Sequence, residues 1–221
     1  MTLPQDKAGK IKYIEMNSVI TSIIFDFGNV FINWDPQALY QRFFPTSGDI
    51  DHFLKEIRFA EWNAQQDAGR SFQEGIAELS SQFPQYSEHI KAYDKFWEES
   101  ITGANTETIE IAYDLKRAGY ALYLLSNFSA EKFPLMLKRY PFLNLFTDMI
   151  ISGEHKLIKP DAAIFHLTLK RINRKAQECV FIDDALANIE TAKSLSFNTI
   201  HYHSPMQLKR ELETILTTNR E

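Results

Sequence analysis

Several polar side chains follow apolar segments of the chain, at positions where buried strands would end or in the loops after them. They comprise an acid, a hydroxyl with an amide, a base and a pair of acids: Asp26, Ser126-Asn127, Lys159 and Asp183-Asp184. In an open α/β sheet, ligands bind beyond the carboxyl ends of the strands. Each group alone could instead belong to a turn, a helix cap or a solvated surface. Four groups at one predicted edge indicate a common site.

The acids in this set suit phosphoryl transfer. A carboxylate at Asp26 could attack phosphorus and form an acyl phosphate, which divides one difficult step into two. Carboxylate and phosphate repel each other, so a divalent cation is expected between them. Asp26, Asp183 and Asp184 would together form the oxygen-rich site that Mg²⁺ prefers. Adjacent like charges are also more stable beside a cation.

The remaining polar residues suit the other side of the same reaction. We expect Ser126 and Asn127, with backbone amides at the following helix start, to donate hydrogen bonds to phosphate oxygens. We expect Lys159 to neutralise the charge that builds up on the nucleophile and the phosphate. The predicted partner is therefore a small phosphorylated metabolite.

The elements that must position these residues alternate between strands and helices. Short apolar, β-branched runs predict strands at 19–25, 121–125, 149–151, 179–182 and 198–202. Apolar residues at three- and four-residue spacing predict helices at 106–118, 129–140, 161–172, 185–195 and 205–216. Such repeated units predict an α/β fold, with a doubly wound, mainly parallel sheet covered by helices on both faces.

Residues 33–105 interrupt this alternation. They contain no convincing strand and predict about four helices, of which the last spans roughly 87–101. Asp35-Pro36 is typical of an N-cap followed by proline, and Ser71 with Glu74 forms a capping-box pattern. We therefore predict a helical cap at 33–105, a catalytic core at 19–32 and 106–221, and a flexible leader at 1–18.

Composition excludes broad classes. The chain has 221 residues, 24 Lys+Arg and 29 Asp+Glu, and a net charge of −5. This charge disfavours a dedicated nucleic-acid binder, which needs a basic face. No apolar window is long enough to predict a membrane span. The single Cys179 excludes an intramolecular disulfide, and no signal peptide is expected, so we predict a cytoplasmic protein. We expect a monomer or a homodimer.

The same segments carry a resemblance to a known family. Ile24-Phe25-Asp26-Phe27-Gly28-Asn29-Val30, Leu125-Ser126-Asn127, Lys159-Pro160 and Phe181-Ile182-Asp183-Asp184 resemble the four ordered motifs of the haloacid dehalogenase-like (HAD) superfamily. The resemblance spans roughly residues 19–202 and implies a Rossmann-like core. Residues 62–79, with Asp67-Ala68-Gly69-Arg70, are similar to a helical-cap branch that includes sugar-1-phosphate phosphatases. Within this segment, Arg70 is a candidate specificity contact.

The resemblance implies a role for each matching residue. Asp26 matches the nucleophile, which also binds Mg²⁺ through its other oxygen. Ser126 and Asn127 match the phosphate-binding pair, and Lys159 matches the lysine that bridges nucleophile and phosphate. These matches imply a hydrolase that acts on phosphoric monoesters.

The resemblance also implies the metal ligands. Gly28 matches the position whose backbone carbonyl binds the metal, Asp184 matches a direct ligand, and Asp183 assists directly or through water. Most phosphatases of the superfamily carry a second Asp at the position of Gly28, which protonates the leaving alcohol. Glycine supplies no proton, so one hypothesis is a substrate with an acidic leaving group, such as a sugar 1-phosphate.

We therefore predict a Mg²⁺-dependent phosphatase for a small phosphomonoester, most simply a sugar phosphate, with an aspartyl-phosphate intermediate. One alternative is a 2-haloacid dehalogenase, which needs no Mg²⁺. Asp183-Asp184 argues against it, because small polar residues are expected there. The other alternative is a catalytically silent phosphate-binding module, which only Gly28 supports.

Overall fold

A five-stranded parallel sheet forms the centre of the molecule. The computed structural model describes residues 19–218, and the predicted leader at 1–18 lies outside the described residues. The sheet order is β5-β4-β1-β6-β7, and every neighbouring pair is parallel. The strands are β1 (Ser22–Phe25), β4 (Ala121–Ser126), β5 (Asp148–Ile151), β6 (Cys179–Asp183) and β7 (Asn198–His201). The predicted doubly wound, mainly parallel sheet is confirmed.

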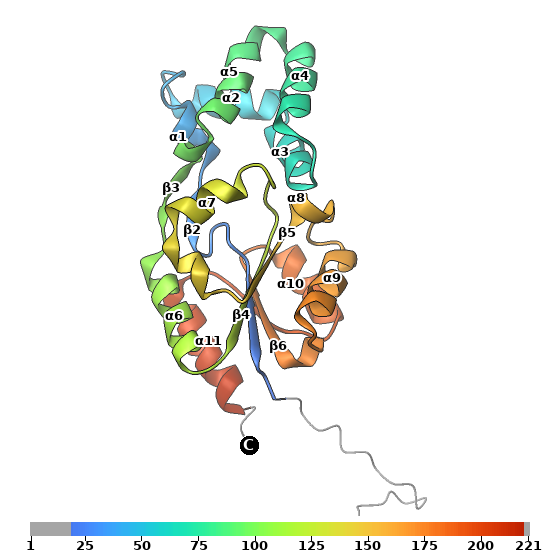
Figure 1. Cartoon of the computed structure of the whole chain (residues 1–221). Coiled ribbons are helices and arrows are strands. Elements are labelled where there is room, and N and C mark those ends of the chain that lie inside the picture. Colours follow the sequence, from blue (N-terminus) through green and yellow to red (C-terminus); the bar gives the residue numbers. More distant parts are fainter. Residues whose placement is uncertain (1–18, 219–221) are drawn as a thin grey trace, which may run out of the picture.

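Helices cover both faces of this sheet (Figure 1). One face carries α6 (Thr106–Arg117), α7 (Phe133–Arg139), η3 (Pro141–Leu145) and α11 (Pro205–Thr218). The other face carries α9 (Ala162–Ile172), η4 (Ala176–Glu178) and α10 (Leu186–Ser194). The short α8 (Ser152–His155) follows β5 directly. The predicted helix at 129–140 becomes regular only at Phe133.

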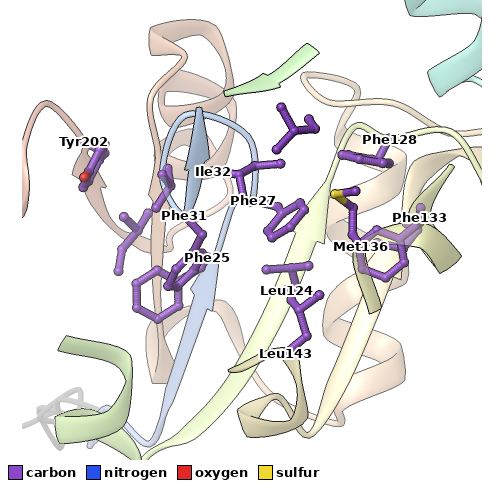
Figure 2. Packing of buried hydrophobic residues seen from close by; sticks show 14 of the residues in the cluster. Phe25, Phe27, Phe31, Ile32, Leu124, Phe128, Phe133, Met136, Leu143 and Tyr202 are labelled. Carbon is purple, nitrogen blue, oxygen red and sulfur yellow. The ribbon is translucent and has the colours of Figure 1, made fainter. Parts of the chain in front are cut away.

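Successive side chains of a strand point to opposite faces of the sheet, and helices cover both faces. In β1, Ile23 and Phe25 enter the larger apolar cluster, whereas Ile24 enters the smaller cluster behind the sheet. Figure 2 shows the larger cluster, where the rings of Phe25 and Phe31 lie 5.0 Å apart. This double burial explains why the central strands β4, β1 and β6 appear in the sequence as continuous apolar runs, whereas the edge strands β5 and β7 are only partly buried.

The cap stands over the carboxyl ends of the strands (Figure 1). Its elements are α1 (Pro36–Tyr40), α2 (Ser47–Glu56), α3 (Phe59–Asp67), α4 (Phe72–Gln82), η1 (Pro84–Tyr86), α5 (Ser87–Lys95) and η2 (Trp97–Ser100). Asp35 caps α1 by accepting a hydrogen bond from the Gln37 amide, and Ser71 with Glu74 forms the predicted capping box of α4. Both local predictions are confirmed.

Two strands in this region contradict the expectation that it contains none. β2 (Ile32–Trp34) and β3 (Ile101–Ala104) form an antiparallel ribbon, with Ile32 opposite Ala104. The predicted helix at 87–101 was also too long, because α5 ends at Lys95. Strands this short show no alternation in sequence, and their pairing joins segments that are distant along the chain. Tertiary contacts therefore decide this ribbon.

Among the described residues, the helices are either too short or too polar to cross a lipid bilayer.

We expect Leu124→Ala to destabilise the protein by about 2–5 kcal/mol, because Leu124 is fully buried in the larger cluster and the change leaves a cavity. Urea unfolding followed by circular dichroism measures this change. The matched control is Leu137→Ala on α7, where the side chain is 45% exposed and a change within about 0.5 kcal/mol is expected. Equal losses for both variants would contradict this description of the core.

Candidate active site

Asp26 is the first residue after β1, and its carboxylate is buried at the edge of the sheet. Its backbone amide donates to the Ile182 carbonyl at 2.8 Å, which extends the pairing of β1 with β6. The chain then turns sharply, with Asn29 in the left-handed region at φ 56°. The Phe31 and Ile32 amides both donate to the Phe27 carbonyl and close this turn.

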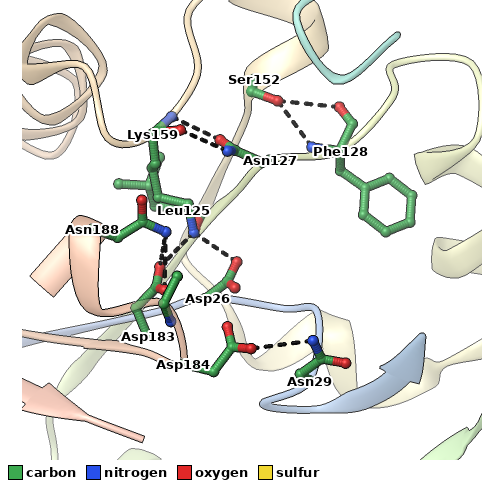
Figure 3. Close-up of polar contacts among 11 residues, drawn as sticks. Asp26, Asn29, Leu125, Asn127, Phe128, Ser152, Lys159, Asp183, Asp184 and Asn188 are labelled. Carbon is green, nitrogen blue, oxygen red and sulfur yellow. Dashed lines mark hydrogen bonds and ion pairs between the residues drawn. The ribbon is translucent and has the colours of Figure 1, made fainter. Parts of the chain in front are cut away.

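Lys159 joins Asp26 to Asp183. Its Nζ lies 2.8 Å from Asp26 Oδ1 and 2.7 Å from Asp183 Oδ2, and it also donates to the Leu125 carbonyl at 2.9 Å (Figure 3). Burial alone lowers the pKa of Lys159, but the two carboxylates more than offset this and raise it. Lys159 is therefore held as a buried cation between two acids.

Asn127 positions the Lys159 backbone. Its Nδ2 donates to the Lys159 carbonyl at 2.9 Å, and its Oδ1 accepts from the Lys159 amide at 2.8 Å. Asn127 also lines the pocket, whereas Ser126 is the buried last residue of β4. The structure thus places Asn127 at the pocket, while Ser126 lies at the adjacent strand end and is not among the lining residues. It also gives the Asn127 side chain a positioning contact that the sequence did not indicate.

Asp183 is completely buried and receives hydrogen bonds from several protein donors. The Ala185 amide donates to Oδ1 at 2.8 Å, and Asn188 Nδ2 lies 3.0 Å from both carboxylate oxygens. Sequence reasoning missed Asn188, although its place five residues after Asp183, at the start of α10, was the available signal. Asp183 is therefore rigidly oriented toward Lys159.

The acids that the sequence singled out form one cluster. Asp26, Asp183 and Asp184 each offer an oxygen, and these oxygens all lie within 4.8 Å of one another. Asp184 is only partly buried, and its Oδ2 accepts from Asn29 Nδ2 at 3.1 Å, a second contact that sequence reasoning missed. Gly28 lines the pocket beside these acids.

The electrostatics of this cluster favour a cation. Burial first, and then the charges of Asp183 and Asp184, raise the pKa of Asp26 to about 7, although Lys159 opposes the rise. Burial also raises the pKa of Asp184. Three crowded carboxylates thus have one buried ammonium between them, and hard oxygen donors of this kind suit Mg²⁺. Magnesium is the cofactor that these residues fit.

The pocket beside Asp26 lies between the core and the cap. Its apolar wall combines residues from the ribbon, the cap and the core: Ile32, Trp34, Phe72, Tyr93, Trp97 and Phe128. Asn63 and Asp67 add polar groups from α3, and sequence reasoning assigned no role to either. Arg70 is not among the lining residues, because its guanidinium bonds to Gln66 and Glu78 within the cap.

Comparisons with known proteins identify the family of this chain. A family model described as haloacid dehalogenase-like hydrolase matches residues 20–195. D-ribitol-5-phosphate phosphatase of Bacteroides thetaiotaomicron is 25% identical over 219 residues, covering 90% of this chain and 100% of that protein. Sesquiterpene phosphatase astK of Aspergillus oryzae is 24% identical over 204 residues, covering 91% and 99%. The match to drimenol cyclase drtB of Aspergillus calidoustus is 26% identical and covers 92% of this chain but only 38% of that protein.

A solved structure shares the fold. It is a HAD family enzyme of Bacteroides thetaiotaomicron in complex with magnesium and inorganic phosphate, with a TM-score of 0.66 and 23% identity, covering 84% of this chain and 95% of that one. The predicted resemblance is confirmed. Since the family model matches most of the chain, this protein belongs to the haloacid dehalogenase-like hydrolases.

Proposed function

We propose that this hydrolase is a Mg²⁺-dependent phosphatase, which cleaves a small phosphomonoester through an aspartyl-phosphate on Asp26. The observation that carries the proposal is the buried Asp26 carboxylate, which lies 2.8 Å from Lys159 Nζ and within the cluster that includes Asp183 and Asp184. Two relatives that cover 90% or more of this chain are named as phosphatases, which supports the same reaction.

In this proposal the tasks of catalysis are divided among the residues of the site. Asp26 attacks phosphorus, and Lys159 neutralises charge on the nucleophile and the phosphate. Asp26, Asp184 and the Gly28 carbonyl would hold the cation, and Asp183 would assist while it orients Lys159. A bound divalent cation would keep Asp26 ionised and offset its repulsion from the phosphate.

Phosphate binding falls to the segment after β4. Ser126 supplies a hydroxyl, and Asn127 contributes its backbone amide because its side chain is engaged with Lys159. The cap closes the pocket over the substrate and limits access of water, as lids do in other enzymes. A pocket that lies between the core and the cap favours a small phosphorylated metabolite over a polymer.

The alternatives are less well supported. A 2-haloacid dehalogenase would not need the carboxylates of Asp183 and Asp184, which are buried or half-buried at the centre of this site. A silent binding module would not need Lys159 Nζ between two acids. The presence of Lys159 between two acids therefore favours an enzyme that turns over its substrate.

Two substrate classes deserve comparison. A sugar phosphate agrees with the resemblance and with the name of D-ribitol-5-phosphate phosphatase, and Asn63 and Asp67 could bond to its hydroxyls. An apolar phosphomonoester agrees with the name of sesquiterpene phosphatase astK. It also agrees with the aromatic wall that Trp34, Phe72 and Trp97 help to form.

We expect the aromatic wall to bind the transition state of an apolar phosphomonoester more tightly than that of a sugar phosphate. The measurement is kcat/KM for an isoprenoid monophosphate and for ribitol 5-phosphate, under identical Mg²⁺. We expect the first value to be at least about tenfold higher, because each methylene buried in an apolar pocket contributes roughly 1 kcal/mol. A higher value for ribitol 5-phosphate would assign the site to sugar phosphates instead.

We expect Asp26→Asn to lower phosphate release at least about a thousandfold, since removal of a nucleophile costs most of the catalysed rate. The amide is nearly isosteric, so the melting temperature should stay close to that of the wild type. The control is Asp114→Asn, on an exposed stretch of α6, which should leave turnover unchanged. Substantial turnover by Asp26→Asn would refute the covalent mechanism.

We expect Mg²⁺ to raise the melting temperature by roughly 5–10 °C at a hundredfold excess over its Kd, because it binds the folded state. Asp184→Asn should lose most of this shift. Glu110→Gln, an exposed change on α6, should retain it. A chelator should abolish phosphate release, whereas halide release from a 2-haloacid that survives chelation would instead favour the dehalogenase class.

A further inference from the structure

The catalytic core offers no proton donor at Gly28, yet the pocket contains a carboxyl group beyond the three-acid cluster. This group is Asp67, the last residue of α3 in the cap, which lines the same pocket as Asp26, Gly28 and Asp184. We propose that Asp67 is the general acid and base of this enzyme, a proposal that rests on the phosphatase function above. The cap thus supplies the catalytic group that the core lacks.

A chain of hydrogen bonds orients the Asp67 side chain. Asn63, one turn earlier on α3, donates through Nδ2 to Asp67 Oδ2 at 3.0 Å. The Tyr93 hydroxyl from α5 donates to Asn63 Oδ1 at 3.3 Å. All three residues line the pocket. The carboxylate is therefore held at the pocket wall by neutral partners, and no cation in the chain of contacts neutralises it.

The core holds the Asp67 backbone in place. Ser152 Oγ, at the start of α8, donates to the Asp67 carbonyl at 2.5 Å. Two residues later Gly69 has φ +96°, and a Cβ there would lie 2.8 Å from the Gly153 carbonyl oxygen. Only glycine allows this close approach between the end of α3 and α8 (Figure 1). These contacts fix Asp67 relative to the core.

The environment of Asp67 suits proton transfer near neutral pH. Burial first, and then the negative charge of Asp26, raise the pKa of the Asp67 carboxyl to about 7, while the Ser129 amide lowers it. Asp26 and Tyr93 interact electrostatically with Asp67. Nearby, Glu131 and Lys132 contact Phe72, Lys132 pairs with Asp94, and Lys156 lies beside Gly69. A carboxyl group in this range can both give and take a proton.

Asp67 gives a proton in the first step of the proposed reaction and takes one in the second. Asp26 attacks phosphorus, the bond from phosphorus to the ester oxygen breaks, and that oxygen takes the proton of the Asp67 carboxyl to leave as an alcohol. Water then gives a proton to the Asp67 carboxylate and attacks the aspartyl-phosphate. This second step releases inorganic phosphate, the Asp26 carboxylate and protonated Asp67.

The first test compares two leaving groups of similar shape in the presence of Mg²⁺. The probes are p-nitrobenzyl phosphate, which leaves as a poorly acidic alcohol, and p-nitrophenyl phosphate, which leaves as an acidic phenol. We expect Asp67→Asn to lower kcat at least about a hundredfold for the benzyl ester, as expected for loss of a general acid. For the phenyl ester, which needs little protonation, we expect the first step to slow less than about threefold.

Dephosphorylation is common to both esters, so the two steps are separated by rapid quench. The burst of p-nitrophenol reports the first step, and later turnover reports the second. Asp67→Asn should preserve the burst and accumulate the aspartyl-phosphate, while Asp26→Asn gives no burst. Equal slowing of both esters in the first step would overturn the acid role. Unchanged later turnover would overturn the base role.

A rescue experiment excludes a merely structural effect. Among the described residues, no atom lies within 4 Å of an ideal Cβ at Gly28, so an aspartate fits there. In the Asp67→Asn background, Gly28→Asp should restore the benzyl ester rate by at least about tenfold. In the wild type, the same change should add little, because Asp67 already acts. A large gain in the wild type with no rescue of the double variant would overturn the proposal.

Two controls complete the design. Asp51→Asn, an exposed change on α2 in the same cap, should leave both ester rates unchanged. Asp67→Ser repeats the test if Asp67→Asn lowers the melting temperature.

If the wild type hydrolyses neither ester nor any other phosphomonoester with Mg²⁺, the phosphatase function itself fails, and the role of Asp67 fails with it. If the wild type turns over normally and the Asp67→Asn variant hydrolyses both esters at the wild-type rate, only the proposal for Asp67 is refuted.

Discussion

The buried ion pairs of Lys159 are the interaction on which the rest of the site depends. A buried ammonium is costly unless opposite charges and hydrogen bonds compensate for its lost hydration. Here Asp26 and Asp183 lie on either side of Nζ at 2.8 and 2.7 Å, and the Leu125 carbonyl accepts a third contact. One side chain thus joins the ends of β1, β4 and β6. Loss of Lys159 would leave the buried carboxylates of Asp26 and Asp183 without the ammonium between them.

The neighbouring residues serve this arrangement. Asn127 bonds to both backbone groups of Lys159, and Asn188 bonds to both oxygens of Asp183. The cap then supplies what the rigid core does not. It brings an aromatic wall over the nucleophile, and it brings Asp67 to the pocket through contacts with α8. The chemistry is therefore divided between a preorganised core and a docked cap.

Local features of the sequence predicted much of the fold. The central strands were recognisable because both of their faces are buried, so each appears as a continuous apolar run. The capped starts of α1 and α4 were recognisable because an N-cap depends on residues within three positions. The ribbon of β2 with β3 was missed, because its pairing joins the two ends of the cap segment. A short strand has too little pattern to reveal such a partner.

The residue types at the strand ends indicated the chemistry, since parallel strands bring their carboxyl ends to one edge. Asp26, Lys159 and Asp183 were predicted to meet there, and they do. The sequence could not reveal the partners that hold them, such as Asn188, or the place of Asp67 in the pocket. Those contacts depend on how helices pack across long sequence separations. Only the tertiary structure brings a cap carboxylate to a core that has glycine at position 28.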